Sequence, residues 1–110
     1  MNTANETVGT GNQLVSFGDA VKALKQGKRV QRKGWNGKDL FIFEQVPSQV
    51  PFDIIPRMSS LPQSVKDILI TRGYSITYSN QIAIVKPNNE INGWSPSTAD
   101  SLAEDWIILD

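Results

Sequence analysis

Neither cysteine nor histidine occurs among the 110 residues of the chain. The absence of cysteine excludes disulfides and thiolate sites. The absence of histidine removes the commonest general base near neutral pH and the commonest transition-metal ligand. Nucleophilic triads and zinc sites are therefore excluded, although a carboxylate-bound Mg²⁺ site stays open on composition alone. We expect a binding protein and not an enzyme, and we assign it no metal ligand and no cofactor.

Long apolar runs are also absent, since no stretch approaches the roughly 20 residues that a membrane-spanning helix needs. We therefore expect no association with a membrane. Residues 1–13 are polar and lack the basic and apolar regions of a signal peptide, so we expect a disordered arm there. The remainder, residues 14–110, is expected to form one small ligand-binding domain, because 39% hydrophobic and 20% charged residues are typical of a globular chain.

The formal net charge is zero, but the charges are unevenly distributed. The segment Lys22–Lys38 contains seven basic residues and no acidic one, whereas Glu90–Asp110 contains five acidic residues and no basic one. We expect these two segments to pair within or between subunits. The neutral total argues against a general DNA-binding protein, which usually carries net positive charge.

Apolar spacing and turn residues predict an α+β fold, a single small domain with short helices packed on a mostly antiparallel sheet. Ser16 and Gly27 bound a first helix with one apolar stripe. A second helix is predicted over 62–72, and a third follows the capping-box sequence from Ser97 to Asp100. Strands are predicted at 29–34, 40–46, 75–78, 82–86, 90–94 and 105–109, with turns at 36–37, 79–80 and 87–89 and a proline-broken loop over 47–57.

One part of the basic segment combines cations, a glycine-framed turn and a tryptophan. The pair Asn36-Gly37 between two strand-like runs is the strongest short-range signal of a β-hairpin, because both residues tolerate positive φ. Such a hairpin places Trp35 opposite Lys38 and Arg32 opposite Phe41. This surface suits a planar base that carries phosphates, because rings stack while arginine and lysine meet the anion. The alternative is that Trp35 is a core residue and the lysines form a solvated face.

A second stretch places Trp94 just before a helix N-terminus that carries hydroxyl groups. Helix N-termini present unpaired N–H donors and a positive dipole end to anions. An acid near a stacking ring, here Asp100, can accept hydrogen bonds from ribose hydroxyls or an amino group. The alternative is that Ser97 and Asp100 only cap their helix and Trp94 belongs to the core. Trp106 precedes three aliphatic residues, so we interpret it as a core residue.

Three motifs occur in order along the chain: Phe17-Gly-Asp-Ala-x-x-Ala-Leu-Lys-x-Gly-Lys, Arg32-Lys-Gly-Trp-Asn-Gly-Lys, and Trp94-x-Pro-Ser-x-x-Asp-x-Leu-Ala-Glu-Asp-Trp. In these motifs the chain resembles a family of small phage proteins, the Thoeris anti-defence two sponges. The resemblance extends over residues 16–109, with a poorly matched middle portion at 48–78.

The resemblance implies a protein that binds its ligand without catalysis. Members of the family assemble as homotetramers and sequester cyclic ADP-ribose-type signals, such as glyco-cyclic ADP-ribose, made by the TIR enzyme of the bacterial Thoeris system. Some members similarly hold cyclic di- or trinucleotides of cGAS-like immunity in separate pockets. We accordingly expect cyclic nucleotide partners, a homo-oligomer, residence in the host bacterial cytoplasm, and no nucleic acid polymer as ligand.

The resemblance also implies that Trp35, Asn36, Trp94, Ser95 and Asp100 line a pocket where two subunits meet. Three further motif residues complete the set of candidate ligand-binding residues: Arg32, Ser97 and Asp105. Two alternatives from other classes stay open. One is a single-stranded nucleic-acid binding module that uses the same basic and aromatic hairpin. The other is a phage structural or assembly protein in which both tryptophans are only packing residues.

Overall fold

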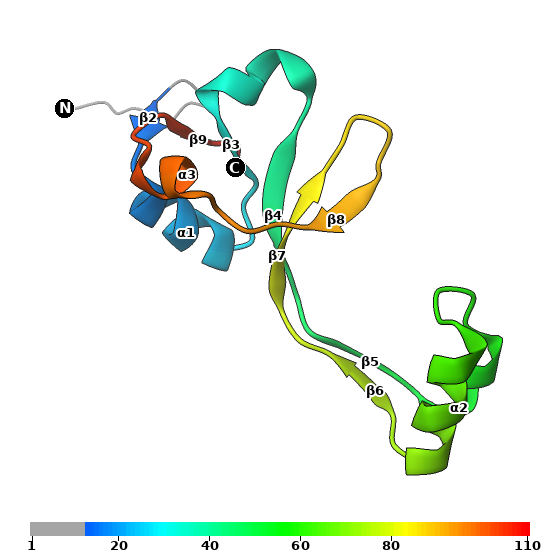
Figure 1. Cartoon of the computed structure of the whole chain (residues 1–110). Helices are drawn as coiled ribbons and strands as arrows, with labels where there is room; N and C mark the ends of the chain where they lie inside the picture. Colours follow the sequence, from blue (N-terminus) through cyan, green and yellow to red (C-terminus); the bar gives the residue numbers. More distant parts are fainter. Residues whose placement is uncertain (1–12) are drawn as a thin grey trace. The chain divides into compact units, whose positions relative to one another are not determined.

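The computed structural model describes residues 13–110 and divides them into two compact units (Figure 1). The first unit comprises residues 13–45 and 81–110, and the second comprises Val46–Asn80. The predicted N-terminal arm lies outside the described residues, except for Gln13. All eight candidate site residues belong to the first unit.

The first unit is built on a six-stranded sheet in the order β2-β9-β3-β4-β7-β8, whose neighbouring strands all pair antiparallel. Together with the short helices, this sheet confirms the predicted α+β fold. The C-terminal strand β9 lies between β2 and β3, which brings the acidic C-terminal segment beside the basic one. The strands of the sheet are β2 (Leu14–Val15), β3 (Val30–Arg32), β4 (Phe41–Gln45), β7 (Gln81–Val85), β8 (Ile91–Gly93) and β9 (Trp106–Ile108).

Helix α1 (Phe17–Lys25) forms between the two signals predicted for it. The Ser16 hydroxyl accepts a hydrogen bond from the Asp19 N–H at 3.1 Å and so satisfies one N–H that a helix start leaves unpaired. Gly27 has a φ of +84°, a left-handed conformation that glycine adopts without a Cβ clash. α1 packs against β3, β4 and β9 and lies beside the short helix α3 (Thr98–Leu102), as Figure 1 shows.

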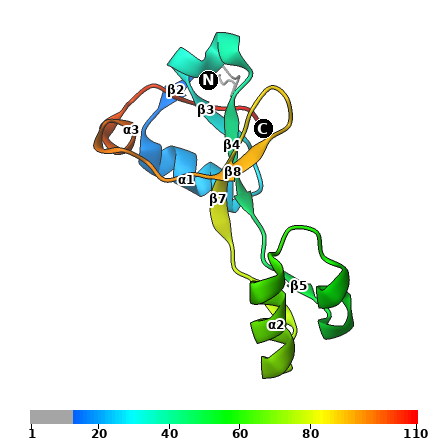
Figure 2. The same cartoon turned by 45° about the vertical axis from the view of Figure 1, so that its right-hand side comes forward.

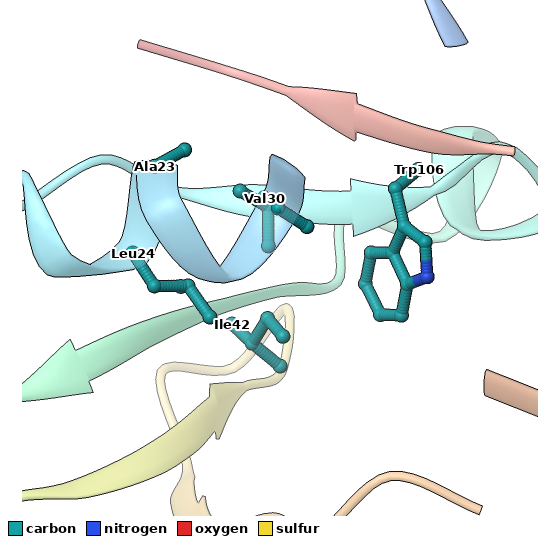
Figure 3. Close-up of a cluster of buried hydrophobic side chains, with 6 residues drawn as sticks. Ala23, Leu24, Val30, Ile42 and Trp106 are labelled. Carbon is teal, nitrogen blue, oxygen red and sulfur yellow. The ribbon is translucent and has the colours of Figure 1, made fainter. Parts of the chain in front are cut away.

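The core of the first unit lies between α1 and the sheet face that carries Val30, Ile42 and Trp106, all of them fully buried. Figure 3 shows Leu24 of α1 pointing toward Ile42 of β4. Removing this apolar surface from water is the main driving force that holds helix and sheet together. The complete burial of Trp106 confirms its interpretation as a core residue.

The connection between β3 and β4 differs from the predicted hairpin. A 3₁₀ helix, η1 (Lys33–Lys38), takes the place of the two-residue turn, and Asp39 follows it with a φ of +53°. The strands are antiparallel neighbours, as predicted, but their pairing is limited to Val30 with Ile42.

The predicted cross-strand pairs Arg32–Phe41 and Trp35–Lys38 are therefore wrong. Arg32 pairs with Trp106 of β9, and Trp35 lies within η1. The physical reason is that η1 lets the Trp35 ring pack against the core cluster. Burying part of an indole outweighs the local preference of Asn-Gly for a tight turn.

The second unit consists of a two-stranded ribbon, a 3₁₀ helix and an α-helix (Figure 2). β5 (Ser48–Val50) pairs antiparallel with β6 (Ile76–Tyr78), and η2 (Phe52–Arg57) contacts α2 (Gln63–Arg72). α2 begins one residue later than predicted, because Pro62 is its extended N-cap, and it ends at the predicted Arg72, where Gly73 follows with a φ of +80°.

Two predictions for the second unit are wrong. The expected loop over 47–57 contains β5 and η2. Pro47 and Pro51 stand just outside β5, where a missing N–H disrupts no ladder, whereas Pro56 lies inside the short helix η2. The expected turn at 79–80 does not join β6 to β7, since each pairs with an earlier strand. β6 pairs with β5 through Tyr78 and Ser48, and β7 pairs with β4 through Gln81 and Gln45.

Candidate ligand-binding site

Arg32 leaves β3 on the same face as buried Val30, because side chains alternate along a strand. Its side chain is only 26% exposed, and a cation so placed needs partners of opposite charge. The guanidinium donates from Nε to Asp105 Oδ1 at 2.9 Å and from Nη2 to Asp105 Oδ2 at 3.3 Å. Its Nη1 donates to Asp100 Oδ1 at 2.9 Å. The basic and acidic segments thus pair within one chain, which is one of the two arrangements expected from the sequence.

Asp100 combines the ion pair with a helix cap. Its Oδ2 accepts from the Ser97 N–H at 2.9 Å, and its own N–H donates to the Ser97 hydroxyl at 3.0 Å, which completes the predicted capping box. Burial acts to raise the pKa of Asp100, but the hydrogen bonds from Ser97 and Arg32 outweigh it and hold the pKa below its ordinary value of 3.8. Hydrogen bonds to Asp105 and then Asp100 raise the pKa of the Arg32 guanidinium. Arg32 and Asp100 are therefore both charged at neutral pH.

Three tryptophan rings meet beside this charged cluster. Trp35 and Trp94 contact each other edge to face with ring centroids 6.1 Å apart, and both rings are half-buried. Buried Trp106 lies 5.6 Å from Trp35 and 6.1 Å from Trp94, again nearly perpendicular. Such edge-to-face pairs are favourable because the positive edge of one ring meets the negative face of the next. The two half-buried tryptophans thus pack on a third that is fixed in the core.

Phe17 also belongs to this aromatic cluster, although sequence reasoning did not assign it to the site. Its ring lies 5.1 Å from Trp106 and 6.5 Å from Trp94. Its position one residue after the helix cap suggested only a place on the apolar stripe of α1. The first motif of the family resemblance, which begins at Phe17, is the signal that could have identified it.

The remaining candidate residues flank this arrangement. Ser95 is exposed between β8 and α3, and Ser97 is the exposed N-cap of α3. Asn36 lies in η1, and its side chain is outside the described part of the structure. The start of α3 is partly engaged already, because its capping box uses the Ser97 and Asp100 N–H groups and brings a carboxylate to it. The structure therefore unites Arg32, Trp35, Trp94, Ser97, Asp100 and Asp105 in one network of rings, ion pairs and caps.

A cavity of about 440 Å³ lies elsewhere in the first unit. Arg29 and Gln31 line it and alternate along the chain with Val30 and Arg32, so cavity and candidate site use opposite faces of β3. The Arg29 guanidinium lies 5.3 Å from the centroid of the Phe41 ring, another lining residue. Among the described side chains, none of the candidate site residues lines this cavity.

Residues 13–110 contain no cluster of three or more acidic side chains placed to hold a metal ion. Among the helices in that range, none combines the length and the apolar character that crossing a bilayer requires.

Fold and site together define a small α+β protein with an aromatic and charged cluster beside one antiparallel sheet. Residues 15–109 match the Thoeris anti-defense 2-like domain family. A relative named Thoeris anti-defense 2, from Bacillus phage SP01, is 37% identical over 98 residues, which cover 86% of this chain and 94% of the relative. The chain belongs to the Thoeris anti-defense 2-like family, and this membership supports a phage anti-defence role.

Proposed function

We propose that the protein is a sponge for a cyclic ADP-ribose-type signal such as glyco-cyclic ADP-ribose, which it sequesters in the host bacterial cytoplasm. The observation that carries the proposal is the edge contact between the half-buried Trp35 and Trp94 rings beside a charged network. The exposed parts of these rings offer an adenine base a surface on which to stack. Each oxygen of the Asp100 carboxylate has a second lone pair, which leaves acceptor capacity for ribose hydroxyls.

The ligand is proposed to leave the protein chemically unchanged. The chain has no histidine or cysteine to act as base or nucleophile. An effective sponge must outcompete the effector that the signal activates, which calls for a Kd near ~1 nM or about −12 kcal/mol. Stacking contributes roughly 1–3 kcal/mol per base, so two rings and several polar contacts reach this affinity only in an enclosed, preformed pocket.

The test is calorimetry and native mass spectrometry with cyclic ADP-ribose and glyco-cyclic ADP-ribose. We expect saturable binding, and intact ligand should be recovered after the complex is heated. Conversion of the ligand at turnover stoichiometry would contradict the proposal, and so would the absence of binding. Binding to oligonucleotides that strengthens with their length and weakens steeply with salt would favour the nucleic-acid binding alternative.

A homo-oligomer, proposed to be a homotetramer, would complete the pocket at a subunit interface. The second unit supports association because it exposes large apolar side chains, with Ile68 52% and Tyr74 78% exposed. Exposed apolar surface of this kind is typical of interaction sites. Light scattering should then report a mass several times the 12.2 kDa of one chain, and Ile68→Glu should lower it. A monomer with full ligand affinity would contradict the interface pocket.

A second ligand class, the cyclic di- or trinucleotides, is proposed for the cavity on the other face of β3. Its lining offers two cations, Arg29 and Lys86, together with the Phe41 ring and the Asn89 amide. The ion pairs of these cations are exposed, Arg29–Asp110 at 3.2 Å and Lys86–Glu90 at 3.9 Å. Exposed pairs contribute little and are easily exchanged for a phosphate.

The double variant Arg29→Gln/Lys86→Gln tests this second site. It should lose affinity for a cyclic dinucleotide about tenfold or more, because each charge-assisted hydrogen bond contributes about 1.5–3 kcal/mol. Its affinity for cyclic ADP-ribose should not change. Equal losses for both ligands would place them in one site and refute the assignment of the cavity.

A further inference from the structure

Arg32 stands at the centre of a network that joins segments remote in sequence. Its guanidinium directs three N–H donors at the carboxylates of Asp100 and Asp105. Each aspartate is held a second time through its backbone carbonyl. The Lys33 N–H donates to Asp105 O at 2.9 Å, and the Trp106 Nε1–H donates to Asp100 O at 3.0 Å.

The charge of this cluster makes Arg32 a poor partner for an anion. One guanidinium stands against two carboxylates, so the three groups together carry a single negative charge. The bidentate contact with Asp105 is a strong arrangement for a guanidinium. To bind Arg32, a phosphate would have to displace the Asp105 carboxylate. The side chains of Arg32, Asp100 and Asp105 are 26%, 18% and 35% exposed, so water screens their attraction only in part.

The same network anchors the segments that carry the exposed rings. η1, which contains Trp35, begins directly after Arg32, and Lys33 at its start is bonded to Asp105. Trp94 precedes α3, whose third residue, Asp100, accepts a hydrogen bond from Arg32. Trp106, bonded to Asp100, contacts both of the exposed rings.

We propose that Arg32 is a positioning residue, which sets the geometry of the Trp35–Trp94 ring pair and makes no contact with the ligand. The inference rests on the proposed function for the identity of the ligand. It reverses the role that the sequence alone suggests, in which Arg32 meets the phosphates.

Two variants separate the two roles. Arg32→Lys keeps the charge but loses the planar fork, and Asp105→Asn keeps the shape but loses the carboxylate. A positioning role predicts that both weaken cyclic ADP-ribose binding about tenfold, the effect of losing one stacking contact. A phosphate-binding role predicts the opposite sign for Asp105→Asn, because a freed guanidinium would bind the anion better. Arg72→Lys, at an exposed position in the second unit, is the matched control.

A further readout makes the test independent of the ligand. In the free protein, the near-ultraviolet circular dichroism of the tryptophans should change in Arg32→Lys and Asp105→Asn but not in Arg72→Lys. A lower Tm with unchanged affinity and spectrum would overturn the proposal, as would tighter binding by Asp105→Asn. If the wild type fails to bind cyclic ADP-ribose, the proposed function fails, and the spectra alone decide on Arg32.

Discussion

Burial separates three tryptophans that make similar ring contacts. Trp106 is completely buried and donates a hydrogen bond from its indole nitrogen, whereas Trp35 and Trp94 each keep part of the ring in water. Because both half-buried rings pack against the core cluster, they contribute to stability as well as to any ligand contact. The role of each ring therefore has to be tested by stability and binding together.

Alanine variants of the three tryptophans should rank by burial. Trp106→Ala should lower the unfolding free energy by about 3–5 kcal/mol, because it leaves a large cavity in the core. Trp35→Ala and Trp94→Ala should cost less, because less apolar surface leaves the interior, but should lose roughly tenfold or more in affinity for cyclic ADP-ribose. Urea unfolding and calorimetry measure the two effects. If either exposed-ring variant proves as unstable as Trp106→Ala and binds normally when folded, that ring is a packing residue only.

The lowered pKa of Asp100 predicts a dependence of stability on pH. A carboxyl whose pKa is lower in the folded than in the unfolded chain stabilises the fold above its unfolded pKa. This contribution is lost as the pH falls from the ordinary value of 3.8 through the lower folded value. We expect the unfolding free energy to decrease on acidification through this range, and Asp100→Asn to show a smaller decrease. Parallel pH profiles for wild type and Asp100→Asn in urea unfolding would contradict this account.

At the scale of elements, helix caps follow from residues close in sequence, whereas the connection between β3 and β4 depends on packing against distant residues. The caps of α1 and α3 lie where hydroxyl and acid residues predict them, since a cap needs only atoms three residues apart. The connection between β3 and β4 follows a distant contact instead, because η1 carries Trp35 to the core cluster. Elements whose stability is local are thus predictable from sequence, and this connection is not.

The cost of the left-handed conformation after α1 can be measured by comparing alanine variants of two glycines. Gly27→Ala should destabilise the protein by about 1 kcal/mol or more, because φ at this residue is +84° and a Cβ resists that conformation. The space around it is open, so backbone strain is the only cost. Gly34→Ala is the matched control, since it meets open space without a positive φ and should leave stability unchanged or slightly raised. Equal melting temperatures for the two variants would show that the strain at Gly27 is absent.

For the whole molecule, the core cluster lies in the first unit, and the second unit exposes large apolar side chains. The fully and partly buried members of the core cluster all lie outside Val46–Asn80. The second unit has Ile55 as its one fully buried large side chain among the described residues, and α2 buries none. A segment of this size rarely supplies enough buried surface to be stable alone.

Replacing Val46–Asn80 by an Asn-Gly dipeptide should leave the first unit folded. Gln45 and Gln81 are directly opposed, and their side chains share a hydrogen bond at 3.1 Å, so a two-residue turn can join β4 to β7. We expect a cooperative thermal transition and the near-ultraviolet spectrum of the full chain. If the second unit forms the interface between subunits, light scattering should also report a smaller assembly. A shortened chain without fixed tryptophan signals would show that the first unit needs the second to fold.

The sequence by itself determined the class of fold, the bounds of α1, the C-terminal end of α2, both capping arrangements and the family resemblance. Each of these depends on residues close together in the chain or on motifs compared as a whole. The sequence also excluded thiolate, imidazole and zinc chemistry, because the absence of cysteine and histidine does not depend on the fold. The eight candidate site residues came from the same motifs, and their role in ligand binding remains a prediction.

Only the tertiary structure decided how those residues meet. Arg32 lies 68 residues from Asp100 and 73 from Asp105 in sequence, and nothing local indicates that the cation faces two carboxylates rather than a ligand. The insertion of β9 beside β3 brings them together, and it also places Trp106 opposite Arg32. Strand order in a sheet is set by the burial of whole faces, which sums contacts over the entire chain. For that reason the residues could be predicted one by one, whereas the network that joins them could not.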